Sequence, residues 1–162
     1  MPSRHTATIT WARNAATFTD NRYSRAHGWA FDGGATVAAS SSPHSVRLPF
    51  SDPAAVDPEE AFVAALSSCH MLWFLSLAAQ AGFVVDHYSD NANGALAPDA
   101  QGRMAITTVT LNPDVAFSGA LVPDDAAVAA LHHRAHEACY LASSVRSEIV
   151  MAGTWRHVPT ER

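Results

Sequence analysis

Residues 61–79 constrain the fold of this chain more than any other segment, because they are apolar over 19 positions and follow a clear helix start. Asp57 can cap a helix, Pro58 suits the first helical position, and Glu60 stands three residues after the cap. These three features favour a helix that begins at Pro58. We therefore predict one long helix from this point towards Gly82.

A segment of this length and composition is also long enough to span a membrane. A span would place Ser67, Ser68 and His70 at the centre of the bilayer, and no basic residues flank the segment. We therefore expect a central helix of a water-soluble protein and no membrane partner. Charged residues make up only 15% of the chain, against about 25% in an average soluble domain, so we expect another subunit to cover part of the surface.

Side chains at helical spacings of four, three, four and three are predicted to form the core-facing stripe of this helix. They are Phe62, Leu66, Cys69, Trp73 and Ser76. Cys69, one of the two cysteines, lies in the middle of the stripe. The sequence therefore predicts that the Cys69 thiol faces the interior.

A second helix is predicted to begin at Pro123-Asp124-Asp125, and it leads to the other cysteine. Its apolar positions recur every three or four residues and are Val128, Leu131, Ala135 and Cys139. Each cysteine is thus placed on the apolar face of a long helix. Helices joined through a sheet can bring two such faces together.

The remaining segments are predicted to form strands and one long loop. Alternating side chains favour a half-buried first strand over residues 6–11. An Asp-Gly turn at residues 32–34 indicates a hairpin between residues 23–31 and 35–40. A proline-rich loop is expected over residues 40–58, a hairpin over 83–117 with a polar turn at 90–94, and a last strand over 147–155. We predict a single α+β domain over residues 1–162.

The net charge and the N-terminal sequence limit the classes of partner and the cellular compartment that we expect. The net charge of −5 and the pI near 5.9 argue against a nucleic-acid partner, which needs a basic surface to neutralise phosphates. Residues 1–15 lack a cationic stretch followed by an apolar one, so we expect a cytoplasmic protein. Two cysteines in that reducing compartment favour a redox or ligand role over a structural disulfide.

Two thiols in reach of each other suit a peroxidase, in which a thiolate becomes a sulfenic acid and a second thiol condenses with it. A thiol in apolar surroundings needs a positive partner to ionise. Arg25, which we place in a strand, is the candidate, held by a carboxylate of Glu59 or Glu60. Ten residues of helix put Glu59 about 15 Å from Cys69. Either the helix breaks between them, or the contact runs through Arg25, which we favour.

Two motifs together resemble the OsmC/Ohr family. The first is Pro58-Glu59-Glu60, followed ten residues after Glu59 by Cys69 in an Ala/Ser-rich helix. The second is the run Ala-His-Glu-Ala-Cys that ends at Cys139 on a later helix. The resemblance covers most of the chain, from the first predicted strand to the last.

This resemblance implies an OsmC-like α+β fold, with antiparallel sheets around two long central helices in an intertwined homodimer. It also implies a thiol-dependent peroxidase with two thiols per active site at the subunit interface. Fatty or aromatic organic hydroperoxides would be the substrates. An external dithiol, such as a lipoyl group, would be the reductant, and we expect no bound cofactor and no metal.

Carried over by position, Cys69 matches the attacking cysteine and Cys139 the resolving one. Glu59 matches the carboxylate that orients the arginine, and Arg25 matches that arginine.

Further side chains on the first helix are expected to bind substrate, namely Phe62, Trp73 and His70. Two positions depart from the family pattern. Tyr140 stands where proline usually follows the second cysteine, and His70 stands where an apolar residue usually follows the first.

Three other functions compete with the peroxidase. His132, His136 and Cys139 can share one helix face, with His70 as a fourth ligand, which suits Zn²⁺ or another borderline metal; His133 lies beside them. A Cys–His hydrolase gains little, because His70 points about 100° away from Cys69 around the helix. A binding module for a lipid-like ligand, without peroxidase turnover, is the last alternative.

Overall fold

The computed structural model describes residues 1–159. Its chain divides into two compact units, Met1–Ala61 and Phe62–Arg162. Helices and several sheets are both present, which confirms the predicted α+β class. The prediction of one domain over residues 1–162 stays a prediction.

The first unit contains a three-stranded antiparallel sheet in the order β1-β2-β3. Its strands are β1 (Ala7–Thr10), β2 (His27–Phe31) and β3 (Thr36–Ala39). Trp29 pairs with Val37 across the predicted hairpin, so the Asp-Gly turn was correctly placed. The expectation of a half-buried first strand was wrong, since β1 is exposed along its whole length. This unit contains only the first turn of a helix, which leaves little to cover the sheet.

The first helix, α1 (Pro58–Gln80), begins where the sequence predicts. The Asp57 carboxylate accepts a hydrogen bond from the Glu60 backbone N–H at 2.8 Å, and the Glu60 carboxylate accepts one from the Asp57 N–H at 3.1 Å. These reciprocal bonds form a capping box. At the other end, Gly82 takes a φ of 82°, a left-handed conformation that suits glycine and ends the helix.

The buried face of α1 differs from the predicted stripe. The buried residues are Leu66, His70, Phe74, Leu77 and Ala78. The predicted Cys69 and Trp73 are half-buried, and Ser76 is exposed. Because α1 is apolar on nearly every side, its composition does not determine which side faces the core. By length and composition alone, α1 would also suffice to cross a membrane.

The second unit contains one long bent hairpin. Its strands are β4 (Val84–Asp90), β5 (Asn93–Pro98), β6 (Met104–Leu111) and β7 (Pro113–Ser118). β4 pairs with β7 and β5 with β6, so the predicted hairpin over residues 83–117 exists. Its turn lies at residues 99–103, where the Asp99 N–H donates to the Arg103 carbonyl at 2.8 Å. The predicted turn at residues 90–94 is instead the bend between β4 and β5.

The predicted last strand is two strands, β8 (Glu148–Met151) and β9 (Thr154–His157). β8 joins β6 and β9 joins β7, both in parallel, which gives the sheets β5-β6-β8 and β4-β7-β9. The sheets are therefore not purely antiparallel. Gly153 separates the two strands, and a Cβ at this position would lie 2.6 Å from Pro113 Cγ.

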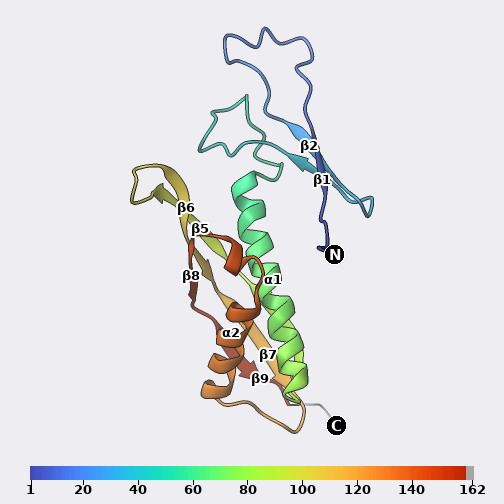
Figure 1. The fold of residues 1–162 in the computed structure, drawn as a ribbon, viewed down its shortest axis with the longest axis vertical. Coiled ribbons are helices and arrows are strands. Elements are labelled where there is room, and N and C mark those ends of the chain that lie inside the picture. The colour runs from blue at the N-terminus through green and yellow to red at the C-terminus, as the bar shows by residue number, and fades with distance from the viewer. Residues whose placement is uncertain (160–162) are drawn as a thin grey trace. The chain divides into compact units, whose positions relative to one another are not determined.

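The second helix, α2 (Asp125–Ala138), lies beside α1 in Figure 1. The side chain of Asp124 caps it by accepting a hydrogen bond from the Ala127 N–H at 2.7 Å. The main core joins both helices to β7 and consists of Phe74, Leu77, Ala78, Val115, Phe117, Val128, Leu131 and Ala135. A short turn of 3-10 helix, η1 (Ala142–Ser144), follows α2. The core thus fixes the two cysteine-bearing segments against each other.

Candidate functional site

The two cysteines come together in the second unit as free thiols. Cys69 is half-buried near the middle of α1. Cys139 is only 1% exposed. It is not on the helical face that was predicted, because α2 ends at Ala138 and Cys139 is the capping residue, with ψ at 112°.

The Cys139 thiol is held in its protonated form. Burial raises its pKa, and a hydrogen bond with the Cys69 thiol raises it further. The Ala142 N–H donates to Cys139 Sγ at 3.4 Å and opposes this effect in part. A protonated, buried Cys139 next to a more exposed Cys69 leaves Cys69 as the sulfur that is open to a reactant.

Arg25 lies in the first unit, in the segment before β2 and not within a strand as predicted. Its guanidinium donates to the Asn21 side chain at 2.6 Å and to the carbonyls of Asn21 and Tyr23. It also stands over the Tyr23 ring, 3.8 Å from the ring centroid. Among residues 1–159 it forms no ion pair with Glu59 or Glu60. Nearby carbonyls hold the guanidinium in place of the predicted carboxylate.

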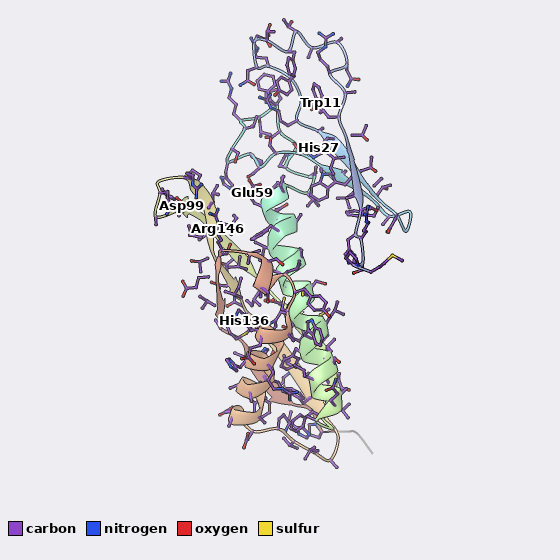
Figure 2. The ribbon with its side chains drawn as sticks, viewed as in Figure 1. Trp11, His27, Glu59, Asp99, His136 and Arg146 are labelled. Carbon is purple, nitrogen blue, oxygen red and sulfur yellow. The ribbon has the colours of Figure 1, made fainter. Side chains whose placement is uncertain are left out.

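Arg25 and Glu59 nevertheless line one cavity of about 490 Å³ in the first unit. Figure 2 labels three of its residues, Trp11, His27 and Glu59. Its aromatic wall consists of Trp11, Phe18 and Tyr23, with Phe18 and Tyr23 stacked at 4.7 Å between ring centroids. A cavity of this size with apolar walls and a few polar groups suits a small organic molecule.

The sequence predicts that Glu59 acts on Cys69 either directly, through a break in the helix, or through Arg25. The structure removes the direct contact. α1 runs without a break from Pro58 to Gln80. Ten helical residues separate Glu59 from Cys69 along the helix axis by about 15 Å. The carboxylate therefore does not reach the sulfur directly, and the route through Arg25 remains a prediction.

His70, expected to bind substrate, is 2% exposed and lies in the interior of the second unit. Its Nε2 shares a hydrogen bond of 3.0 Å with Nδ1 of His132 on α2. Burial lowers the pKa of each imidazole from 6.5 to about 4. His70 also lies near His136, which lowers its pKa, and near Asp90, which raises it. In this position His70 ties the two helices together and is not open to substrate.

The other two predicted substrate-binding residues are half-buried. Phe62 lines a separate cavity of about 660 Å³ together with Val145 and Arg146. Trp73 lies one helical turn after Cys69, and its ring meets the Tyr140 ring edge-on, 5.6 Å between centroids. Trp73 is therefore the one of the three that lies beside the thiols and keeps an exposed surface.

The histidines of α2 do not form the predicted metal site. Among residues 1–159, no group of three or more His, Cys, Asp or Glu side chains is placed to hold a metal ion. His132 is engaged with His70, and Cys139 has left the helix on which the three ligands were to share a face. His132, His133 and His136 instead line a cavity of about 540 Å³ between α2 and the last two strands, and Figure 2 shows His136 on α2.

A model of the OsmC-like protein family matches residues 51–152, which include α1, both cysteines and the long hairpin. The chain belongs to this family. Among curated proteins, no match was found.

Solved structures support the assignment of this OsmC-like protein. An OsmC-like protein of unknown function from Vibrio cholerae is 51% identical over 94% of this chain and 100% of that chain, with a TM-score of 0.92. An organic hydroperoxide resistance protein from Elizabethkingia anophelis is 16% identical over 98% and 99%, with a TM-score of 0.66. The OhrB organic hydroperoxide resistance protein of Bacillus subtilis is 19% identical over 95% and 98%, with a TM-score of 0.60. At such identities the last two show a shared fold.

Two features of this OsmC-like protein, one in each unit, were missed in the sequence. The aromatic wall of Trp11, Phe18 and Tyr23 is spread over 13 positions without a helical or strand period, so no pattern indicated it. The partner of His70, His132, stands 62 residues away. A polar residue in an apolar helix was the available signal, because a buried imidazole needs a hydrogen-bond partner.

Proposed function

We propose that this OsmC-like protein is a thiol-dependent peroxidase that reduces organic hydroperoxides to alcohols. The observation that carries the proposal is the contact between the Cys69 and Cys139 thiols, of which Cys139 is the more buried. Two thiols that contact each other are suited to form a disulfide, and the more exposed sulfur is suited to attack. The family and its fold agree with this chemistry.

The reaction has three balanced steps. The Cys69 thiolate attacks the distal oxygen of the hydroperoxide; an S–O bond forms, the O–O bond breaks, and the alkoxide leaves as the alcohol after taking a proton. The Cys139 thiol then attacks the Cys69 sulfenic acid, so that a disulfide forms and water leaves. An external dithiol, such as a lipoyl group, reduces the disulfide by thiol exchange and becomes a disulfide itself.

Arg25 and Glu59 complete the proposed machinery. A guanidinium beside the attacking sulfur favours the thiolate, and a carboxylate that pairs with it would fix its orientation. Both residues line the same cavity of the first unit, which supports a joint role. The pairing requires Arg25 to exchange its bonds with Asn21 for a bond with Glu59.

We propose that the protein is cytoplasmic and that it forms a homodimer. Apolar side chains exposed in the single chain support it, among them Ile9 of β1 and Leu72 of α1, each 61% exposed. Such surfaces are more often covered by another protein chain than left in water.

Replacement of the attacking sulfur tests the proposal. Cys69→Ser should abolish the consumption of an aromatic hydroperoxide in the presence of a dithiol, whereas Ser68→Ala, at the exposed neighbouring position, should leave consumption unchanged. Circular dichroism checks that both variants are folded. Consumption that persists in Cys69→Ser would refute the peroxidase.

A binding module without turnover is the second candidate, and the aromatic cavity around Trp11 favours it. Tryptophan fluorescence titration with an aromatic alcohol would detect binding. If the ligand binds and the parent protein consumes no hydroperoxide, the binding module is the better account.

A further inference from the structure

Two aromatic rings connect the segments that carry the two cysteines. Trp73 lies on α1, four residues after Cys69, and therefore on the same side of the helix. Tyr140 directly follows Cys139. Their rings meet edge-to-face, with centroids 5.6 Å apart and planes at 86°. This is the favourable geometry for an aromatic pair, so the two rings join the turn after α2 to α1.

The backbone of the turn that contains Cys139 forms no hydrogen bond with α1 among the described residues. The backbone hydrogen bonds of Cys139 and Tyr140 stay within the turn and the end of α2: the Ser143 N–H donates to the Cys139 carbonyl at 3.1 Å, and the Ser144 hydroxyl donates to the Tyr140 carbonyl at 2.7 Å. They shape the turn but do not attach it to α1. The position of Cys139 relative to Cys69 therefore depends on side-chain contacts, which include the contact between the two thiols and the aromatic pair.

Tyr140 itself is not part of the core. Its side chain is 71% exposed, although Cys139 beside it is almost completely buried. A large aromatic ring at such a position contributes little to burial. What it does contribute in the second unit is the contact with Trp73.

We propose that Tyr140 is a positioning residue for the second step of the reaction, in which Cys139 resolves the oxidised Cys69. This inference rests on the proposed peroxidase function. The Trp73–Tyr140 contact holds the turn against α1, and so keeps the Cys139 sulfur in reach while Cys69 carries an oxygen.

The proposal concerns a competition between two fates of the Cys69 sulfenic acid. Attack by the Cys139 thiol gives the disulfide and releases water. Attack on a second hydroperoxide molecule transfers another oxygen to Cys69, giving the sulfinic acid and the alcohol. The second fate consumes the enzyme, because a sulfinic acid is not reduced by ordinary thiols. A looser turn slows the first reaction and leaves the second unchanged.

Tyr140→Ala tests the inference, with Tyr140→Phe as the conservative variant and Leu141→Ala as the control at the next position of the turn. Each full-length protein is reduced, treated with a fixed excess of cumene hydroperoxide, and examined by intact-mass spectrometry. The disulfide appears as the loss of two hydrogens and the sulfinic acid as the gain of two oxygens. The loss of Cys69 thiol with the first equivalent is followed separately by stopped flow.

In Tyr140→Ala, the ratio of sulfinic acid to disulfide should rise about two- to tenfold, the range that corresponds to one aromatic pair. The first oxidation should keep its rate. Tyr140→Phe retains the ring and should behave as the parent protein does, as should Leu141→Ala.

An unchanged ratio in Tyr140→Ala would overturn the inference while the peroxidase stands. An equal rise in Leu141→Ala would also overturn it, because any disturbance of the turn would then suffice. If the parent protein reacts with hydroperoxide at neither cysteine, the proposed function fails and the inference fails with it.

Discussion

The buried pair of His70 and His132 makes the stability of this protein depend on pH in a defined window. Both imidazoles are neutral in the folded protein, because burial lowers each pKa from 6.5 to about 4. Above pH 6.5 the folded and unfolded chains both carry neutral imidazoles here. As the pH falls below 6.5, the unfolded chain takes up protons that the folded protein refuses until about pH 4. The free energy of unfolding therefore falls across this window.

The magnitude follows from the pKa values. A pKa about 2.5 below the ordinary value corresponds to about 3 kcal/mol at 1.36 kcal/mol for each pKa unit. Each ring is less than a tenth exposed, at 2% and 8%, so solvent screens this effect little. Because the two rings share one hydrogen bond, the loss for the pair is not simply twice that of one ring. We expect the loss between pH 6.5 and 4 to be about 3 kcal/mol or more.

Urea unfolding between pH 7 and pH 4.5 measures this dependence. The parent protein should lose stability steadily over the range. The double variant His70→Leu/His132→Leu removes both imidazoles and should show a much flatter profile, whereas His87→Gln, at an exposed position of β4, should keep the parent profile. A parent profile that is flat, or a double variant that retains the full slope, would refute the reasoning.

Two further predictions concern the stability of the second unit, at the junction of β8 and β9 and at the start of α2. Gly153→Ala should destabilise the protein by about 1–3 kcal/mol, because its Cβ would lie 2.6 Å from Pro113 Cγ and 2.9 Å from the Pro113 carbonyl oxygen. The control is Gly28→Ala, because nothing lies within 4 Å of a Cβ at that position. Equal unfolding temperatures of the two variants would contradict the predicted clash. Asp124→Ala removes the cap of α2 and should lower the free energy of unfolding by about 1 kcal/mol, measured by urea unfolding. Asp124→Asn should recover most of this stability. An unchanged free energy of unfolding in Asp124→Ala would show that the cap is not needed.

The ends of both helices could be predicted because their signals are local. Asp57 and Asp124 cap helices with bonds to backbone N–H groups only three residues away. Gly82 ends α1 through its own backbone conformation. Likewise the hairpin between β2 and β3 is specified by its turn. Such elements depend on a few consecutive residues, so the sequence contains all that is needed.

The orientation of α1 could not be predicted in the same way. Its apolar residues lie on several faces, and the buried face is chosen by long-range contacts, among them the bond between His70 and His132. The bend between β4 and β5 is also set at long range, since the Asp90 carboxylate accepts a hydrogen bond from the Asn112 N–H at 2.7 Å. The polar run at residues 90–94 looked like a turn because its partner was not known.

For the candidate site, the cysteines were identified by position and family motif, and the structure brings their thiols together. In the structure, groups other than the predicted carboxylate hold Arg25, and the reason is local. Asn21 and Tyr23, four and two residues before it, offer oxygens that hold the guanidinium. A search for carboxylates alone overlooked these nearer acceptors.

The central claim is that Cys69 and Cys139 form a disulfide after Cys69 has reduced a hydroperoxide. The most direct test treats the reduced protein with one equivalent of an aromatic hydroperoxide and maps the cysteines by peptide mass spectrometry after alkylation of free thiols. The account predicts a linked pair of peptides containing Cys69 and Cys139 within one chain. Two free thiols, or Cys69 overoxidised with Cys139 still free, would contradict it.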